Sequence, residues 1–350
     1  MIEAADISDL SQTTRSPLFL RETDGNVYCD LCPNNCEIKS GNFGACGVRG
    51  SKGGKGIIPF YGFISALAVD PVEKKPLYHF MPGTQILSAG FAGCNLRCPF
   101  CQNWHISQNT DIPGKWMKPG EIISAALGQD TPSIAYTYSE PLVHAEYLLD
   151  CMTLARRHGI ANVLVTNGCV NAGPAAEILE LADAVNVDLK SFSPETYKKM
   201  LGGDLRTVLD FIGLCHKMGV HLEITTLVVP DLNDSDDELN AASDFIASLD
   251  AQIPWHLSAY HPDYRWNAPP TDPGFLLRTA KEARKKLSFV YTGNFTAEND
   301  THCLSCGALL VRRRGYHVEL KGLARDSAGG EKMYKCAKCG KLTKIPHGKP

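Results

Sequence analysis

The sequence has no long uninterrupted hydrophobic run. Its longest apolar stretch, residues 57–69, is broken by Pro59, Gly62 and Ser65, and it is shorter than the roughly 20 residues that a membrane-spanning helix needs. Residues 1–10 carry three acids and lack the positive flank and apolar core of a secretory signal. We therefore expect no membrane anchor and no export, and we expect the protein in the cytoplasm.

The composition also lacks the extremes that mark disordered or fibrous chains. Of the 350 residues, 44% are hydrophobic, 21% are charged and 8% are aromatic, as in ordinary globular domains. The net charge is only −3, but residues 311–350 hold eleven Lys or Arg against three acids, a local +8 that leaves −11 for the other 310 residues. Such asymmetry is compatible with a nucleic-acid or acidic partner, and equally with a solvated basic face.

Cysteine, in contrast, is abundant, with 14 residues. In a reducing compartment, clustered cysteines predict metal ligands rather than disulfides. Cys151, Cys169 and Cys215 stand alone within regular elements, where a small buried apolar side chain is the expected role. The other eleven form three groups: Cys29, Cys32, Cys36 and Cys46; Cys94, Cys98 and Cys101; and Cys303, Cys306, Cys336 and Cys339.

Short apolar runs alternate with helical stretches from about residue 85 onwards. This alternation predicts an α/β fold with parallel strands joined by helices. Helices are expected from Pro141 to before Gly159, over 236–249 and from Pro273 to about 287. The expected strands are 86–92, 133–138, 162–167, 184–189, 221–229 and 255–260, with 288–293 as a candidate seventh.

A doubly wound sheet and a barrel both fit this alternation, and in both folds ligands gather at the carboxyl ends of the strands. The alternation stops after Asn294. We therefore expect three parts: a cysteine-rich N-terminal segment (1–84), a core domain (85–297) and a small C-terminal module (298–350).

The central cysteines have the spacing C-x3-C-x2-C, in the run GCNLRCPFCQNW of residues 93–104, directly after the first predicted strand. At the cysteine content of this chain, only about 0.02 such triples are expected by chance. Three thiolates hold three corners of a cubane cluster and leave one iron without a protein ligand. An open coordination position is typical of a catalytic metal rather than a structural one.

This loop resembles that of the radical S-adenosylmethionine (SAM) superfamily, and the form CNLRCPFCQN is similar to the activating enzymes of glycyl-radical enzymes. Over about residues 25–345, the runs VDPVEKKPLYHF (69–80) and YTYSEP (136–141) and the terminal cysteine pairs resemble AmmeMemoRadiSam enzymes. The resemblance implies a partial (βα)6 TIM-like barrel whose 4Fe-4S cluster is ligated by Cys94, Cys98 and Cys101 and binds SAM. It also implies reductive cleavage of SAM to a 5′-deoxyadenosyl radical, which abstracts hydrogen from an unidentified protein or small molecule.

The resemblance further implies that side chains at the strand ends contact SAM. Glu140 matches the acid of a Gly-Gly-Glu that receives the SAM ammonium, but Tyr138 and Ser139 replace the glycines. The alternative is that Glu140 interacts with the dipole at a helix N-terminus. Asp188 and Lys190 point to one face of their strand, and an ion pair is the alternative there. The full set of implied contacts is Phe100, Glu140, Thr166, Asn167, Asp188, Lys190 and His261.

The terminal cysteine groups predict two small metal modules. In the C-terminal group, two C-x2-C pairs separated by 29 residues predict a closed zinc site formed by Cys303, Cys306, Cys336 and Cys339, with rubredoxin-like iron as the alternative. The N-terminal group, Cys29, Cys32, Cys36 and Cys46, has the spacing C-x2-C-x3-C-x9-C. It is compatible with zinc or with an auxiliary iron-sulfur cluster, and its difference from the ferredoxin spacing favours zinc.

Two functional hypotheses follow. The resemblance implies an oxidoreductase that receives electrons from flavodoxin or ferredoxin, with Memo-like and Amme-type domain proteins as partners. The alternative is a metal-stabilised module that binds nucleic acid or protein through its basic C-terminal part and uses the central cysteines for a structural or redox-sensing cluster. A radical SAM enzyme that modifies RNA would combine the two.

Overall fold

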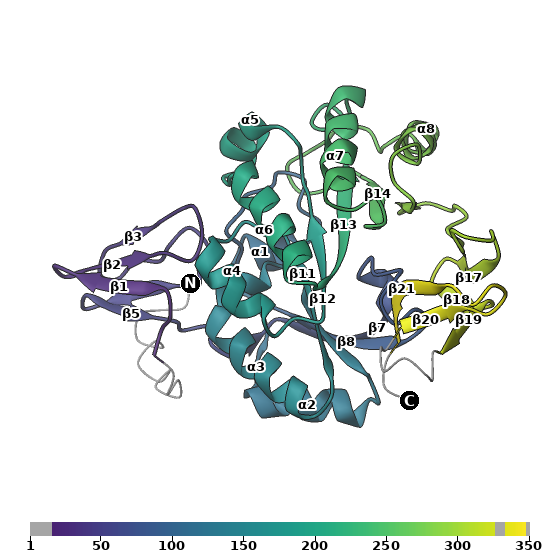
Figure 1. Cartoon of the computed structure of the whole chain (residues 1–350). Helices are drawn as coiled ribbons and strands as arrows, with labels where there is room; N and C mark the ends of the chain where they lie inside the picture. Colours follow the sequence, from purple (N-terminus) through teal and green to yellow (C-terminus); the bar gives the residue numbers. More distant parts are fainter. Residues whose placement is uncertain (1–15, 326–332, 348–350) are drawn as a thin grey trace.

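The computed structural model describes residues 16–325 and 333–347 (Figure 1). Its centre is an eight-stranded sheet in the order β15-β14-β13-β12-β11-β10-β8-β7, which does not close on itself. Seven of these strands are parallel, and each overlaps a predicted strand, including the candidate seventh. They are β8 (Gln85–Gly90), β10 (Ser133–Thr137), β11 (Ala161–Thr166), β12 (Ala184–Asp188), β13 (His221–Val228), β14 (Trp255–Ala259) and β15 (Val290–Gly293). The predicted α/β class with a parallel, partly closed sheet is confirmed.

Helices join the parallel strands. The helix predicted after Pro141 begins as a 3-10 turn, η3 (Pro141–His144), and continues as α3. The predicted helix over 236–249 is α7, and Ser235 caps it by accepting a hydrogen bond from the Glu238 N–H. Helix α8 ends at Ala283, before the predicted 287, because Lys285 and Lys286 donate to carbonyls three residues back. The longer helices are α2 (Pro119–Gly128), α3 (Ala145–Arg157), α4 (Ala172–Leu179), α6 (Leu205–Lys217), α7 (Asp236–Leu249) and α8 (Pro273–Ala283). Short helical turns are η2 (Val72–Lys74), α1 (Trp104–Ser107), α5 (Pro194–Thr196) and η4 (Tyr197–Leu201).

The two faces of the parallel sheet bury different partners, because side chains alternate along each strand. On one face, residues such as Tyr136, Leu164 and Val185 belong to the main hydrophobic cluster with the helices. On the other face, residues in the amino-terminal halves of the strands form a second cluster with the loop that precedes β8. The members of this second cluster are Val72, Leu77, Phe80, Ile86, Ala135, Val163 and Ala184.

The sheet is extended at one edge by β7 (Ala66–Pro71), which runs antiparallel to β8. This strand is not among the predicted strands, since its middle residues are exposed and it lacks the buried run of its parallel neighbours. Residues 72–84, called here the floor loop, then fold against the inner face of the sheet, with Leu77 and Phe80 fully buried. The floor loop thus fills the amino end of a barrel that the strands leave open.

A buried polar network fixes the floor loop. The Glu223 carboxylate accepts hydrogen bonds from the backbone N–H groups of Tyr78 (3.0 Å) and His79 (2.7 Å) and from the imidazole of His256 (2.7 Å). Burial works against the ionised form, but the side chains of His221 and His256 outweigh it and hold the pKa of Glu223 below its usual value. Because its carboxylate is buried and fully hydrogen-bonded, we interpret Glu223 as a structural residue that stabilises the floor loop.

Small antiparallel sheets lie at opposite sides of the central sheet (Figure 1). The N-terminal one is purple and the C-terminal ones are yellow. Their strands are β1 (Leu20–Thr23), β2 (Asn26–Cys29), β3 (Glu37–Ile38), β4 (Gly50–Lys52) and β5 (Lys55–Ile57), and then β16 (Thr301–His302), β17 (Leu309–Arg314), β18 (His317–Leu320), β19 (Leu323–Arg325), β20 (Met333–Cys336) and β21 (Leu342–Pro346). A further pair joins β6 (Phe63–Ile64) to β9 (Lys115–Trp116).

The N-terminal and C-terminal segments differ in where their apolar side chains pack. Val27 and Ile38 belong to the main cluster of the core, whereas Leu310 and Val311 form a small cluster with the C-terminal cysteines.

The three-part division at 84/85 and 297/298 stays a prediction, and residues 1–15, part of its first segment, lie outside the described residues. Within the described ranges, no helix has the length and apolar character needed to cross a bilayer.

Candidate functional site

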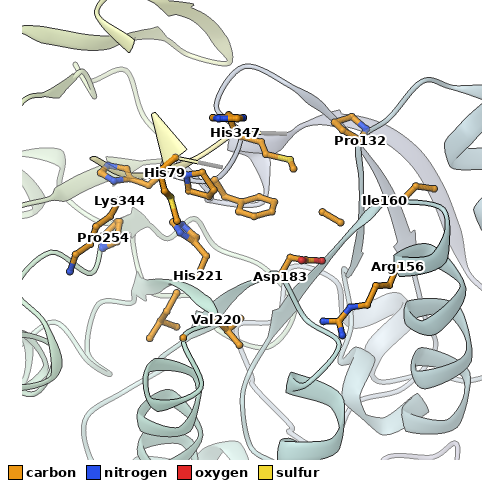
Figure 2. Close-up of a pocket in the computed structure, with 18 of the residues that line it drawn as sticks. His79, Pro132, Arg156, Ile160, Asp183, Val220, His221, Pro254, Lys344 and His347 are labelled. Carbon is orange, nitrogen blue, oxygen red and sulfur yellow. The ribbon is translucent and has the colours of Figure 1, made fainter. Parts of the chain in front are cut away.

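Two cavities lie at opposite ends of the parallel sheet. The larger, about 770 Å³, is at the amino end, and Figure 2 shows residues that directly precede strands, such as Pro132, Ile160, Asp183 and Val220, at its wall. The smaller, about 270 Å³, is at the carboxyl end and is lined by the three central cysteines. Because ligands of parallel α/β sheets bind at the carboxyl ends of the strands, we take the smaller cavity as the candidate functional site.

The cysteine loop leaves the sheet at the end of β8. Cys98 is buried, Cys94 and Cys101 are half-buried, and the Leu96 N–H and the Asn167 side-chain amide donate to the Cys94 sulfur at 3.3 and 3.6 Å. Burial raises the pKa of the Cys98 thiol to about 12 and that of Cys94 well above its usual value. Binding of a metal by these cysteines must therefore displace protons.

The sulfur spacing distinguishes the central cysteines from the C-terminal ones. The sulfurs of the four C-terminal cysteines all lie within 4.8 Å of one another. Among the described residues, the three central cysteines do not meet this criterion. A Zn–S distance of about 2.3 Å places tetrahedral sulfurs about 3.8 Å apart. The wider spacing of the central sulfurs fits a cluster of several metal ions better than a single ion.

Glu140 connects the cavity to two neighbouring strand ends. Its carboxylate accepts hydrogen bonds from the Thr166 hydroxyl (2.6 Å), the Asn167 N–H (2.8 Å) and the Leu142 N–H (3.0 Å). Burial raises the pKa of Glu140 to about 7, although these three donors lower it. Glu140 therefore caps the helical turn after β10 and also lines the cavity.

Tyr138 takes the backbone conformation that glycine adopts most easily. Its φ is +69°, a region in which a bulky non-glycine residue is uncommon and strained. Its hydroxyl donates to Asp70 at 2.6 Å, and the Lys75 ammonium lies 4.4 Å from its ring centre. The chain thus keeps a glycine-like turn at a position where Gly-Gly-Glu is expected, and contacts from β7 and the floor loop hold the tyrosine there.

Asp188 and Lys190 form an ion pair of 2.9 Å at the end of β12, beside the cysteines. Burial opposes the charge of Lys190, but Asp188 and the Cys98 thiol outweigh it, so the pKa of Lys190 is raised. Lys190 in turn lowers the pKa of Cys98, against the larger effect of burial. The ammonium is thus placed where negative charge would develop on metal-bound thiolates.

The other sequence-predicted contacts divide into lining and supporting positions. Phe100, Asn167, Asp188 and Lys190 line the cavity with Glu140 and the three cysteines. Thr166 does not line it but orients Glu140, and the exposed His261 lies at hydrogen-bond distance (3.1 Å) from Gln102, next to the third cysteine. The SAM-contact roles of all these residues stay predictions.

Several lining residues were not assigned to the site from the sequence. Lys74 reaches the cavity from the floor loop and pairs with Asp70 at 2.8 Å. Ser258 and Asn294 lie at the ends of the last two parallel strands. The expectation that ligands bind at strand ends could have pointed to Ser258 and Asn294, but no periodic signal linked Lys74 to the cavity.

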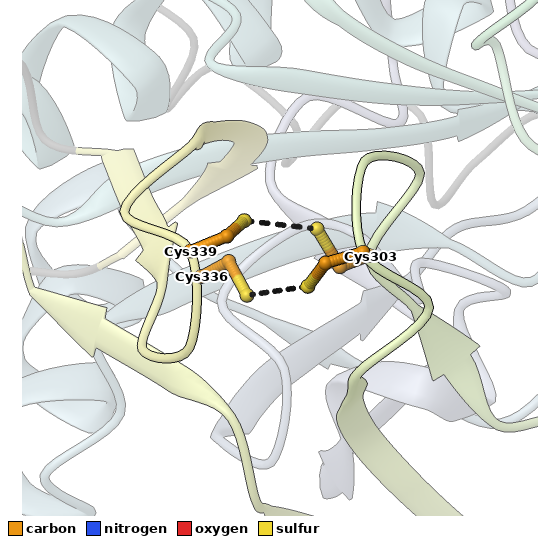
Figure 3. Close-up of side chains that lie close together, drawn as sticks. Cys303, Cys336 and Cys339 are labelled. Carbon is orange, nitrogen blue, oxygen red and sulfur yellow. Dashed lines mark hydrogen bonds between the residues drawn. The ribbon is translucent and has the colours of Figure 1, made fainter.

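The C-terminal cysteines form two matching turns that face each other (Figure 3). In each turn the first cysteine carbonyl accepts a hydrogen bond from a glycine N–H four residues later: Gly307 to Cys303 and Gly340 to Cys336. Both glycines have positive φ, +68° and +71°. The sulfur pairs Cys303–Cys339 and Cys306–Cys336 are each 3.7 Å apart, which matches the spacing of a tetrahedral metal site with four cysteine ligands.

Acidic side chains partly neutralise the basic C-terminal part. Arg313 is buried, and Arg314 pairs with Asp300 at 3.1 Å. Lys321 and Lys344 also pair with carboxylates, those of Glu319 and Asp250. Two other basic residues of this part, Lys332 and Lys349, lie outside the described residues. Part of the local +8 charge is therefore not displayed as a free basic surface, whereas Arg325, Lys338 and Lys341 are exposed.

Comparisons with known proteins found a family model, relatives and solved structures that are similar to this chain. The model of the radical SAM superfamily matches residues 90–241. The protein MJ0808 of Methanocaldococcus jannaschii is 37% identical over 339 residues, which cover 95% of this chain and 99% of that one. The pyruvate formate-lyase-activating enzyme of Clostridium pasteurianum is 27% identical over 180 residues, 49% of this chain and 73% of that one. The crystal structure of Streptococcus suis SuiB bound to S-adenosylmethionine covers 58% of this chain and 48% of its own, with 15% identity and a TM-score of 0.46.

Proposed function

Because the chain belongs to the radical SAM superfamily, we propose that it is an enzyme that cleaves SAM reductively at a 4Fe-4S cluster ligated by Cys94, Cys98 and Cys101. The observation that carries this proposal is the lining of the carboxyl-end cavity: its described residues include these three cysteines and no fourth. Three protein thiolates leave one iron open to a small ligand. When bound, the cluster supplies the electron that splits SAM into methionine and a 5′-deoxyadenosyl radical.

The surrounding side chains bind and orient the cofactor in this proposal. Glu140 is held in place by three protein donors, and with its pKa near 7 a nearby ammonium group favours its ionised form. Lys190 places a positive charge beside Cys98, and the Asn167 amide donates to the Cys94 sulfur at 3.6 Å. Hydrogen bonds and cations near thiolate sulfurs raise the reduction potential of a cluster.

The substrate is a hydrogen donor, either a protein as in the glycyl-radical-activating enzymes or a small molecule. A reactive radical requires the donor to be close and competing donors to be excluded. The floor loop closes the amino end of the partial barrel, so the substrate enters at the carboxyl end. A low-potential electron donor such as flavodoxin or ferredoxin completes the reaction, and the AmmeMemoRadiSam subtype with its Memo-like and Amme-type partners remains a prediction.

The test is anaerobic reconstitution with iron and sulfide, followed by addition of dithionite and SAM. The wild-type protein should release methionine and 5′-deoxyadenosine, and Cys98→Ala should release neither. Cys215→Ala is the matched control, because Cys215 is a buried lone cysteine of α6 and does not line the cavity. Equal product release by wild type and Cys98→Ala would contradict the proposal.

For the C-terminal set we propose zinc. The sulfur spacing of 3.7 Å supports a single tetrahedral ion, and the backbone N–H of Cys339 lowers the pKa of the Cys336 thiol, which favours thiolate ligation. A site closed by four cysteines is structural rather than catalytic. The alternative function, nucleic-acid binding through this part, is weakened by the buried and paired arginines and lysines described above; salt-sensitive RNA binding would restore it.

A further inference from the structure

The four N-terminal cysteines lie near one another, since Cys29, Cys36 and Cys46 all act electrostatically on the Cys32 thiol, and the proposed function does not use them. Cys29, Cys32 and Cys46 are 7–8% exposed, and Cys36 is partly exposed. Burial raises the pKa of the Cys29, Cys32 and Cys46 thiols, and nearby backbone N–H groups oppose it: Leu31 at Cys29, Asn34 at Cys32, and Val48 and Arg49 at Cys46. The Cys36 sulfur accepts a hydrogen bond from the Ala45 N–H at 3.3 Å. The same kind of bond, from Leu96 to Cys94 at 3.3 Å, occurs in the central loop.

Backbone donors aimed at sulfur stabilise thiolates, as at cluster-binding sites. In the C-terminal group, the backbone N–H groups of Ala308 and Cys339 likewise act to lower the pKa of the Cys306 and Cys336 thiols. All three cysteine groups thus have backbone donors near sulfur. What separates them is the distance between sulfurs.

The N-terminal sulfurs are spread more widely than the C-terminal ones. Among the described residues, no three of the N-terminal cysteines belong to a set whose ligand atoms all lie within 4.8 Å of one another, whereas the C-terminal four do. A single zinc ion requires sulfurs about 3.8 Å apart. Like the central triad, the N-terminal group does not meet this spacing, and inorganic sulfide between several irons accommodates thiolates that are farther apart.

A buried arginine adds a second observation. The Arg49 side chain is 1% exposed and acts electrostatically on the thiols of Cys29 and Cys46. Its guanidinium pairs with Glu146 at 2.7 and 2.9 Å, but its Nε has no hydrogen-bond partner among the described residues. An unpaired buried donor is costly, and the Arg49 side chain also lowers the pKa of the Cys29 thiol by its charge and by a hydrogen bond, against the larger effect of burial.

The N-terminal cysteine loops touch the central cysteine loop. The Asn34 side chain donates to the Asn95 carbonyl at 3.1 Å, and the Arg97 guanidinium donates to the Ala45 carbonyl. Gly93 packs so closely on this module that a Cβ there would lie 2.4 Å from the Cys46 carbonyl oxygen. Asn34, Ala45 and Cys46 of the N-terminal cysteine loops therefore lie against residues 93–97 of the central loop.

We propose that Cys29, Cys32, Cys36 and Cys46 bind an iron-sulfur cluster that delivers electrons to the cluster held by the central cysteines. This choice replaces the zinc that the sequence spacing favours. A reduced ferredoxin or flavodoxin loses one electron to the N-terminal cluster, which passes it to the central cluster; that cluster is oxidised again as the electron breaks the carbon–sulfur bond of SAM. The electron acceptor rests on the proposed function, whereas the metal content of the N-terminal site does not.

Metal content is tested first, on full-length protein purified without oxygen. The triple variant Cys94→Ala, Cys98→Ala, Cys101→Ala removes the central cluster and leaves the N-terminal module unchanged. It should lose about four irons per chain and keep two or four, with equal sulfide and an EPR signal on reduction. Zinc should stay at about one per chain, and Cys151→Ala is the control for substitution of a buried lone cysteine.

A triple variant that contains no iron would overturn the proposal. This holds whether it contains one zinc, at the C-terminal site, or a second zinc at the N-terminal site. This result does not depend on the folding of any variant of the N-terminal cysteines. It is also independent of SAM cleavage, so failure of the proposed function would leave the iron measurement valid.

Electron delivery is tested by comparing two reductants. Cys36→Ser alters the most exposed N-terminal ligand, and it should lose most of the 5′-deoxyadenosine release driven by reduced ferredoxin, with a much smaller loss when dithionite is the reductant. Equal losses with both reductants would show that the N-terminal site is structural and would overturn the relay. Cys151→Ala should change neither rate.

Discussion

The two ends of the parallel sheet use ionisable side chains in opposite ways. At the amino end, Glu223 is completely buried, and two backbone N–H groups and two histidines saturate its carboxylate. At the carboxyl end, Asp188 and Lys190 form an ion pair but keep 29% and 19% of their side chains exposed, in a wall that also contains thiols. An ammonium has three donors, so Lys190 retains capacity for a ligand. The comparison teaches that a closed network holds the fold together at one end, whereas a partly open one lies at the end where we propose the reaction.

The largest effect is expected from breaking the closed end. Glu223→Leu removes the acceptor of the Tyr78 and His79 N–H groups and leaves buried donors unpaired. We expect a loss of about 3–5 kcal/mol in the free energy of unfolding, measured from urea unfolding curves. SAM cleavage per folded molecule should stay near the wild-type rate. A stable variant would show that the network is dispensable and would remove one side of the comparison.

The next effect is expected at the open end. Lys190→Met removes the charge beside Cys98 with little change in volume, and the rate of SAM cleavage should fall about 100-fold, as for loss of one preorganised electrostatic group. The midpoint of urea unfolding should change little, since the pair is partly exposed. A variant that loses stability but not rate would reverse the assignment of the two ends.

A pH effect should distinguish the closed end from the open one. Burial lowers the pKa of His79 to about 3, with Arg313, His221 and His256 acting in the same direction and Glu223 opposing them. The unfolded state therefore binds a proton more readily, and stability is lost as the pH falls below about 6.5. This single group should cost about 2 kcal/mol by pH 5. His79→Gln keeps a hydrogen-bonding side chain and should flatten unfolding curves measured between pH 7 and 5; an unchanged slope would contradict the assignment.

The smallest effect is expected at the hydrogen bond between Tyr138, at the carboxyl end of β10, and Asp70 of the edge strand β7. Tyr138 lines the cavity, and its hydroxyl donates to Asp70 of β7 at 2.6 Å. Tyr138→Phe should cost about 0.5–1.5 kcal/mol in unfolding free energy, because Asp70 keeps the hydrogen bonds that Lys74, Lys75 and Ser88 donate. Its KM for SAM should rise only modestly, because the backbone turn remains. A large loss of kcat with unchanged stability would instead make the hydroxyl part of the reaction.

The parallel strands and the positions of the cysteine groups were predictable because their signals are local. A buried parallel strand is a short β-branched run, and metal ligation requires fixed cysteine spacing. The exposed strand β7 and the floor-loop residue Lys74 were missed, since their places depend on distant parts of the sheet. The glycine-like turn at Tyr138 could not be predicted either, because it is held by Asp70 and Lys75, more than 60 residues earlier.

The position of the floor loop has a consequence for dissecting the molecule. A fragment that begins at residue 85, at the predicted boundary, would retain every parallel strand and the three central thiols but would lose Leu77 and Phe80, which seal the underside of the barrel. It would also lose the carbonyl of Tyr78, to which Arg313 donates from the C-terminal strands. Such a truncated protein would expose its interior to water from below, and a radical formed in it would be quenched by solvent-borne donors.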